Sequence, residues 1–309
     1  MAKKKELKRV KNKKYFNYKR RRGDRRDGWR VHSNDPVFYL IPHIMNTRLD
    51  SMVFFEERVD TEILDNFVRK LRRESEMKNL ARLVVFMAVV VRAMSQYPKI
   101  NRFVAGGKIY ARNSISISLT VKKEMKLDSE ESTITPSFSP DATLPEIWRI
   151  VQDELDKVKG ANAEDNDTGA VVNLVSSLPQ WLIKAVVNSF RRKDKKKGVP
   201  KFIHEASPFH ASMFITDIGS VGIGSVYHHL YEFGTCSIFA SMGRKEKVLA
   251  LGENGEVKEK QTINFRFTVD ERILDGYYYG KALRYMVHLM KHPELLMERP
   301  AEVKEDPLI

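Results

Sequence analysis

The sequence predicts an α/β fold, because segments with the periodicity of a strand and segments with the periodicity of a helix follow one another along the chain. Residues 115–121 alternate apolar side chains with serine and threonine, which indicates a strand with one buried face. Residues 79–96 repeat apolar side chains at helical spacing, and Pro98 ends this helix. A last helix is predicted at 276–291, so both kinds of element are expected along the whole chain.

The other elements are predicted from the same periodicities and from cap and turn residues. Asp60 or Thr61 is a suitable N-cap. Gly106 and Gly107 indicate a hairpin turn, and Pro145 suits the first turn of a helix. In chain order these elements are a strand at 52–60, helices at 61–74 and 145–157, a loop at 160–169, a largely helical segment at 171–190, a charged loop at 193–197, and strands at 211–216, 235–241 and 261–269.

The composition indicates a cytoplasmic protein without a membrane segment. The chain has 309 residues, of which 42% are hydrophobic, so it can bury a sizeable core. Its longest apolar run, 83–91, is about half of what a membrane-spanning helix requires. Cys236 is the single cysteine, which leaves no partner for an internal disulfide and suits a reducing compartment.

Positive charge is concentrated at the N-terminus. Residues 1–30 hold fifteen Lys or Arg and three acidic residues, a net charge of +12 out of the chain's +14. We therefore expect a basic, disordered tail at 1–36, a folded domain at 37–298 and a C-terminal tail at 299–309. Residues 3–30 could bind nucleic acid weakly through phosphate contacts and stacking, or could be only a solubilising or assembly arm.

Three short segments carry a family resemblance. Residues 270–276 read Asp-Glu-Arg-Ile-Leu-Asp-Gly, residues 97–103 read Tyr-Pro-Lys-Ile-Asn-Arg-Phe, and residues 213–219 read Met-Phe-Ile-Thr-Asp-Ile-Gly. In this order and spacing they resemble motifs of the chloramphenicol acetyltransferase-like superfamily, specifically the catalytic domain of the 2-oxo acid dehydrogenase acyltransferases (dihydrolipoamide acyltransferase). The resemblance covers roughly residues 37–298.

The resemblance implies a mixed sheet flanked by helices and a homotrimer whose active sites lie between subunits. It also implies a channel that admits coenzyme A or acyl-CoA at one end and the acyl acceptor at the other. No metal is expected, because no spacing of His, Cys, Asp and Glu is typical of a zinc site. The tail before Val37 is too short for a lipoyl-bearing domain, so a lipoyl group would have to come from a partner chain.

The resemblance assigns roles to individual residues. Glu271 stands where the family has its catalytic histidine, and Thr216 stands where a hydroxyl stabilises the tetrahedral oxyanion. Asp275 matches the aspartate that orients the catalytic loop through a salt bridge to an arginine. Arg48 is the first candidate for that arginine, and Arg30 is the second.

The segment after Thr216 is expected to line the channel. Asp217 replaces a usual asparagine or serine and adds a carboxylate near the site. Gly219, Gly222 and Gly224 superficially suggest a phosphate-binding loop, but the lysine and the strand–helix context of such a loop are missing. Channel lining is therefore the better interpretation.

A glutamate base is chemically demanding. A free glutamate has a pKa of about 4.3 and a thiol one of about 8.5, so proton transfer is uphill by roughly 6 kcal/mol unless an apolar or negatively charged site intervenes. His228 or His229 could supply the base instead, or could pack at a subunit interface. His210 is expected to be structural.

Three functions follow from these observations. The first is acyl transfer from an acyl-CoA or acyl-lipoyl donor to an unidentified acceptor, with Thr216 and an atypical base. The second is a catalytically silent homologue that acts as a trimeric scaffold or ligand-binding protein. The third is an association with nucleic acid through the basic tail.

Overall fold

A computed structural model describes residues 18–33, 35–122, 131–160, 177–252 and 254–308. The strands are β1 (Gly28–Arg30), β2 (Met52–Asp60), β3 (Arg102–Ala105), β4 (Lys108–Arg112), β5 (Ile115–Lys122), β6 (Glu131–Ile134), β7 (Ser137–Phe138), β8 (Met213–Asp217), β9 (Ile238–Leu251) and β10 (Val257–Asp270). The α-helices are α2 (Pro36–Ile44), α3 (Glu62–Glu74), α4 (Arg82–Gln96), α5 (Leu144–Gly160), α7 (Gln180–Lys197), α8 (Lys201–Ala206) and α9 (Gly276–Lys291). Short 3₁₀ turns are η1 (Pro98–Asn101), η3 (Pro208–His210), η4 (Gly219–Val221), η5 (Glu271–Ile273) and η6 (Pro293–Leu296).

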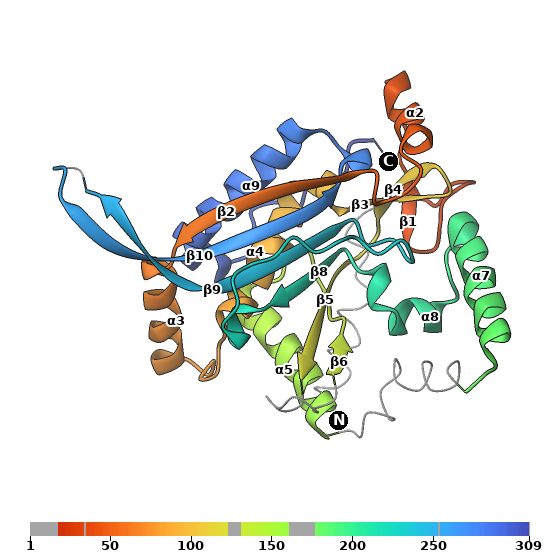
Figure 1. Cartoon of the computed structure of the whole chain (residues 1–309). Coiled ribbons are helices and arrows are strands. Elements are labelled where there is room, and N and C mark those ends of the chain that lie inside the picture. The colour runs from red at the N-terminus through yellow and green to blue at the C-terminus, as the bar shows by residue number, and fades with distance from the viewer. Residues whose placement is uncertain (1–17, 34, 123–130, 161–176, 253, 309) are drawn as a thin grey trace.

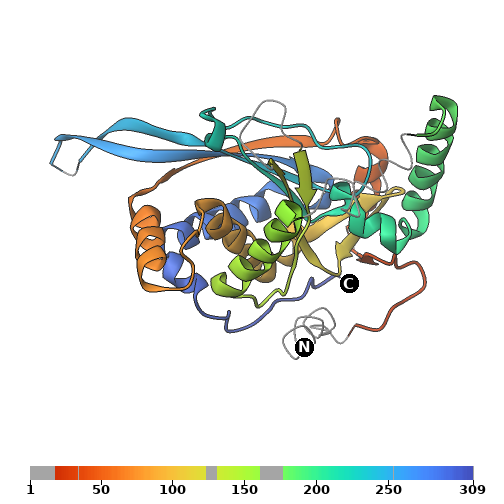
Figure 2. The same ribbon diagram turned by 90° about the horizontal axis from the view of Figure 1, so that it is seen from below.

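The main sheet is mixed, as predicted. Its strands lie in the order β2-β10-β9-β8-β5-β6, and β7 pairs with β5. Strand β8 is parallel to both of its neighbours, β5 and β9, whereas the other pairs in this sheet are antiparallel. A second, three-stranded sheet has the order β1-β4-β3. Helices α3, α4, α5 and α9 lie together on one face of the main sheet (Figures 1 and 2).

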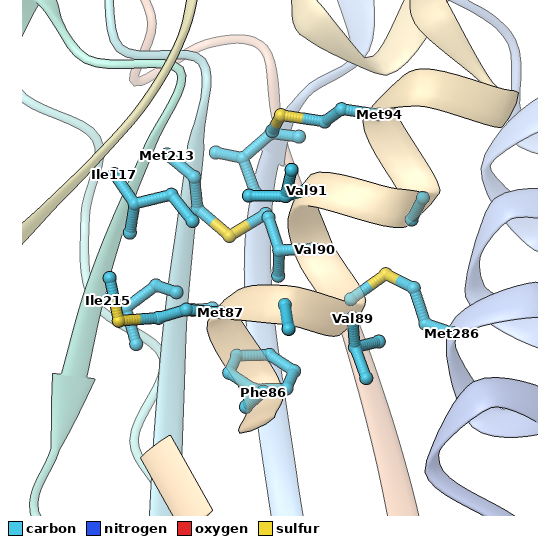
Figure 3. Close-up of a cluster of buried hydrophobic side chains, with 14 of the residues drawn as sticks. Phe86, Met87, Val89, Val90, Val91, Met94, Ile117, Met213, Ile215 and Met286 are labelled. Atoms are coloured by element: carbon cyan, nitrogen blue, oxygen red, sulfur yellow. The ribbon is translucent and has the colours of Figure 1, made fainter. Parts of the chain in front are cut away.

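The core lies between this sheet and α4. The helix is apolar on nearly all sides, and every residue from Val84 to Ser95 is buried, as expected for a helix covered on all faces. Phe86 packs against Phe265 of β10 with ring centroids 4.7 Å apart. Figure 3 shows methionine and valine side chains of α4 filling the space between Met213 and Ile215 of β8 and Met286 of α9.

Strands β9 and β10 are longer than predicted. Each has fourteen residues, and their far ends form a hairpin that projects from the body (Figure 1). The predicted strands at 235–241 and 261–269 covered only the part that packs on the core. The remainder lacks a buried face, with Leu249 and Leu251 exposed, so its apolar pattern did not indicate a strand.

The ordered chain extends beyond the predicted domain at both ends. Residues 28–30 pair with β4, so the boundary placed at Val37 was too late. At the other end, Asp306 is buried and accepts hydrogen bonds from Arg102, with Arg102 Nη2 2.6 Å from Asp306 Oδ1. The segment 299–308 therefore packs on the domain.

Other predictions had mixed outcomes. The helices at 61–74, 79–96, 145–157 and 276–291 and the hairpin at Gly106 are confirmed. The charged loop predicted at 193–197 is wrong, because these residues form the last turns of α7. The predicted loop at 160–169 falls almost entirely outside the described residues. None of the helices among those residues is long and apolar enough to cross a bilayer.

Candidate functional site

A buried ion pair fixes the loop after β10. The carboxylate of Asp270 is fully buried and accepts hydrogen bonds from the side chain of Arg272, at 2.8 Å from Nε and 2.7 Å from Nη2. Arg272 Nη1 also donates to the carbonyl of Met45, at 2.9 Å. Tyr279 Oη donates to the Asp270 carbonyl at 3.1 Å, which ties the loop to helix α9. The backbone between β10 and α9 is therefore rigidly held.

Glu271 lies on this loop with its side chain exposed. Its backbone N–H donates to the carbonyl of Ser51 at 2.9 Å, so the main chain is fixed while the carboxylate faces solvent. Asp275 is also exposed and forms the N-cap of α9, where its side chain accepts a hydrogen bond from Tyr278 N at 3.0 Å. Its role in this chain is that of a helix cap.

The predicted salt bridge between Arg48 and Asp275 is wrong. The Arg48 guanidinium is buried and donates to three backbone carbonyls, among them Val104 O at 3.2 Å and Glu232 O at 3.2 Å. Burial lowers the pKa of Arg48, and the nearby Asp270 carboxylate opposes this shift. Arg30, the second candidate, lies in β1 and shows no contact with Asp275. The pair that orients the loop is Asp270 with Arg272, both of which stand in the motif itself.

Thr216 lies on the outer face of the main sheet, opposite the face that α4 covers. It is half-buried and pairs with Ser241 of β9. Ser241 in turn pairs with Arg266 of β10, and Arg266 pairs with Glu56 of β2. Four strands thus place a hydroxyl, a second hydroxyl, a guanidinium and a carboxylate in one row across the sheet.

Arg266 and Glu56 hold the chain segment that crosses this face. Arg266 Nε lies 2.9 Å from Glu56 Oε2, and Arg266 Nη1 donates to the carbonyl of Ser225 at 2.7 Å. Tyr227 Oη is 3.3 Å from the same Glu56 oxygen. This network was not predicted from the sequence, although residues 264, 266 and 268 alternate polar side chains with the core residues of β10. That alternation is typical of a strand whose second face carries polar side chains that make contacts of their own.

The two adjacent histidines lie on the outer face. His228 stacks on Phe239 of β9, with ring centroids 4.0 Å apart, and its Nδ1 is 2.8 Å from the His229 carbonyl. Burial lowers the pKa of His228, which favours the neutral ring. Because Phe239 precedes Ser241 by two residues, His228 lies about 7 Å along the strand from the row that contains Thr216. His229 is exposed.

Asp217 and the following glycines form a tight turn against β9. Asp217 accepts a hydrogen bond from Ser220 N at 3.1 Å. Burial raises the pKa of the Asp217 carboxyl, and backbone hydrogen bonds from Ser220 and Gly219 partly oppose the shift. A Cβ on Gly219 would lie 2.4 Å from the Gly243 carbonyl oxygen, so close packing requires glycine there. Gly222 has a φ of 79°, which also favours glycine, and Gly224 follows in the segment that crosses the face.

Thr216 and Glu271 do not meet within one chain. The row containing Thr216 reaches β10 at Arg266, and Glu271 lies five residues further along, or about 17 Å at strand spacing. Two interstrand gaps add about 10 Å in the perpendicular direction. His210, the remaining histidine of interest, is buried and bonded to Ser207 and Asp194 and is structural, as expected.

A groove of about 450 Å³ lies between α3, the start of α4 and the β9–β10 hairpin, and its lining mixes five basic side chains with the carboxylates of Asp60, Glu62, Asp65 and Glu259. Arg82 and Lys245 line it and both form ion pairs with Asp65. Arg69 and Arg72 also line the groove, and no carboxylate among the described residues pairs with either. The charge of Arg82 acts to lower the pKa of Asp217, against the raising effect of burial.

Among the described residues, no group of three or more His, Cys, Asp or Glu side chains is arranged so that it could hold a metal ion.

Comparisons with known proteins agree with this architecture. Residues 161–298 match the model of the 2-oxoacid dehydrogenases acyltransferase (catalytic domain) family. A probable dihydrolipoamide acetyltransferase from Listeria monocytogenes 4b F2365 superposes with a TM-score of 0.55 at 15% identity, covering 86% of this chain and 95% of that one. The cubic core of a pyruvate dehydrogenase multienzyme complex gives 0.53 at 10% identity, with 84% and 88% covered. Chloramphenicol acetyltransferase gives 0.51 at 8% identity, with 84% and 96% covered.

No curated protein sequence matches the chain. The likeness therefore rests on the family match and on the fold. The chain has the chloramphenicol acetyltransferase-like fold, and its C-terminal part resembles the catalytic domain of the 2-oxoacid dehydrogenase acyltransferases.

Proposed function

We propose that the protein transfers an acyl group from an acyl-CoA, or from an acyl-lipoyl group, at a site shared between two copies of the chain in a homotrimer. The observation that carries this proposal is the placement of Glu271. It is exposed on a rigid loop, yet it lies far from Thr216 of the same chain. A second copy that presents its Thr216 to Glu271 would complete the constellation and would remove the carboxylate from water. Burial of this kind is the general way in which a carboxylate becomes a stronger base.

The chemistry then follows from the two side chains. Glu271 accepts the proton of the acceptor's thiol or hydroxyl while that group attacks the thioester carbonyl carbon. The hydroxyl of Thr216 donates a hydrogen bond to the oxyanion of the tetrahedral intermediate. When the intermediate collapses, the carbon–sulfur bond to coenzyme A breaks, and the departing sulfur takes the proton back from Glu271.

His228 is the alternative base. It already lies on the same sheet face as Thr216, and its lowered pKa keeps the ring able to accept a proton. Glu271→Gln and His228→Gln separate the two possibilities, because only the residue that acts as the base should cost several orders of magnitude in turnover. His229→Gln is the third variant, because His229 is exposed beside His228 and was the other histidine predicted as a base.

The groove between α3 and the β9–β10 hairpin offers two guanidinium groups to a donor that carries phosphates. Arg69 and Arg72 have no carboxylate partner among the described residues, so their charges are available for an anion. One of the groove's lining side chains, Arg82, also acts on the carboxyl of Asp217 at the end of β8. We therefore assign the groove to the nucleotide end of coenzyme A. Because Cys236 is the single cysteine and no internal disulfide can form, we place the activity in the cytoplasm.

The experiment that tests this proposal mixes two inactive variants. Thr216→Ala and Glu271→Gln should each abolish transfer of acetyl groups from acetyl-CoA to dihydrolipoamide. Oligomers formed by unfolding and refolding the two together contain interfaces with one intact Thr216 and one intact Glu271. These mixed oligomers should regain a fraction of the activity, whereas each variant refolded alone should not.

Two outcomes contradict the proposal. A mixture that stays inactive, although both variants form normal oligomers, would exclude a site shared between copies. Binding of coenzyme A to the wild-type chain without any turnover would favour the catalytically silent scaffold, which the replacement of the family's histidine by Glu271 also fits.

A further inference from the structure

Two basic segments that are far apart in the sequence meet at one end of the molecule. Residues 18–30 carry seven Lys or Arg and two Asp, and α7 carries seven Lys or Arg and one Asp. The five cations at 19–22 and 26 are exposed, and so are all seven on α7. In both views the N-terminal segment passes beside α7 (Figures 1 and 2).

A buried guanidinium joins the two segments. Arg25 has no exposed side-chain surface, and its Nη2 donates to Asp194 Oδ1 of α7 at 2.8 Å and to Asp27 Oδ2 at 2.9 Å. It also lies over the ring of Phe103, 5.1 Å from the centroid. A third carboxylate, Asp24, accepts hydrogen bonds from the N–H groups of Arg21 and Arg30. The acidic side chains of both segments are thus used internally.

The fold therefore gathers two strongly basic segments on one surface. Residues 18–30 hold a net charge of +5 and α7 holds +6, which together make +11. None of the exposed cations of 18–30 or of α7 forms an ion pair with a carboxylate in the described ranges. Exposed positive charge that is clustered on one face and not paired with carboxylates is typical of proteins that bind polyanions.

We propose that this surface, formed by residues 18–30 and α7, binds the phosphate backbone of single-stranded nucleic acid. Arginines supply six of its twelve exposed cations, and the planar guanidinium matches phosphate oxygens in a bidentate manner. Trp181, at the start of α7, is 72% exposed and offers a ring on which a base can stack. The proposal is independent of acyl transfer.

The first test measures binding of a fluorescent 20-nucleotide oligouridylate by anisotropy, with the full chain, from 50 to 200 mM salt. The wild type should bind with an affinity that falls steeply with salt. Lys195→Glu/Lys196→Glu/Lys197→Glu should weaken binding at least tenfold and reduce the slope of log K against log salt by about 2. The matched control reverses Lys70, Lys281 and Lys291, which are exposed elsewhere, and should change the affinity less than threefold.

The second test separates this surface from a mere excess of charge. Asp194→Ala makes the chain more positive by one unit, so a charge-count effect predicts tighter binding. The proposed surface predicts weaker binding, because Arg25 keeps Asp27 but loses its partner on α7, so this ion pair no longer holds the N-terminal segment against α7. Thermal unfolding checks that the variant remains folded, and the lysine reversals decide the matter if it does not.

Three results would overturn the inference. One is the absence of salt-dependent binding by the wild type. Another is an equal loss of affinity for the oligouridylate in the lysine-reversal variant and in its control variant. The third is binding of phosphatidylserine vesicles, or of polyglutamate, as tight as binding of the RNA at the same salt concentration, which would assign the surface to a membrane or to an acidic protein.

Discussion

The molecule has two interior regions that are built differently. The region under the main sheet consists of apolar side chains, such as Phe86 and Met87 of α4, whose packing needs no specific partner. The region between β4, the N-terminal segment and α7 buries the charged side chains of Arg25, Asp27 and Asp194. Apolar packing stabilises the fold at any pH. Buried charges fix two distant segments in one register, but only while each partner keeps its ionisation state.

The largest expected effect comes from the apolar region. Phe86→Ala should lower the free energy of unfolding by about 3–5 kcal/mol, because it removes a buried ring from a close-packed site. The loss should be the same at pH 7 and pH 5 in urea titrations. Ile63→Ala, at an exposed position of α3, is the control and should cost less than about 1 kcal/mol. A loss of unfolding free energy in Phe86→Ala that depends on pH would contradict this difference between the apolar and the charged region.

The charged region predicts a loss that depends on pH. Burial acts to raise the pKa values of Asp27 and Asp194. Hydrogen bonding to Arg25 nevertheless keeps the pKa of Asp27 lowered. His210, followed by Arg25, keeps the pKa of Asp194 well below its usual range. Both carboxylates therefore stabilise the fold at pH values above their ordinary pKa of 3.8. This stabilisation is lost as the pH falls toward their pKa values in the folded state.

Arg25→Met would remove the guanidinium that Asp27 and Asp194 share and would leave Asp194 bonded to His210 alone. It should lower the free energy of unfolding by about 3 kcal/mol at pH 7. At pH 3.5 the cost should shrink, because the variant's buried carboxylates are then protonated and uncharged. Urea titrations of the variant and the wild type at both pH values measure this difference. An equal loss at both would show that Arg25 acts through packing alone.

The smallest expected effect concerns His204 beside the same cluster. Burial, and then the positive charge of Arg112, lower the pKa of His204 to about 4 from 6.5. The folded state therefore resists protonation, and wild-type stability should fall as pH drops from 6.5 toward 4. His204→Phe should remove roughly 2 kcal/mol of that fall. The exposed His32 is the control, since His32→Ala should leave the slope unchanged.

Local patterns predicted most of the fold. The strand at β2, the helices α3, α4 and α9 and the mixed sheet were found from periodicity, caps and the resemblance, because each buries one face or all faces against the core. The far end of the β9–β10 hairpin and the strand β1 were missed. Their pairing is satisfied by a neighbouring strand, and their side chains carry no apolar period that would reveal it.

The candidate site was predicted less completely than the fold. The motif at 270–276 and Thr216 were located from the sequence. The ion pair of the motif was expected between Asp275 and Arg48, whereas the structure forms it between Asp270 and Arg272, which are only two residues apart. The clamp between Arg266 and Glu56 joins strands separated by about two hundred residues. Such a contact depends on strand order, which no local pattern specifies.

By itself, the sequence determined the apolar core, the mixture of helix and strand and the position of the motif at 270–276, because these depend on neighbours in the chain. The tertiary structure alone decided which charges meet. It brought Arg25 to Asp194, gathered the basic residues at one end and separated Thr216 from Glu271. Electrostatic interactions act through space and depend on burial, so their partners are set only when the sheet order and the packing of α7 are set.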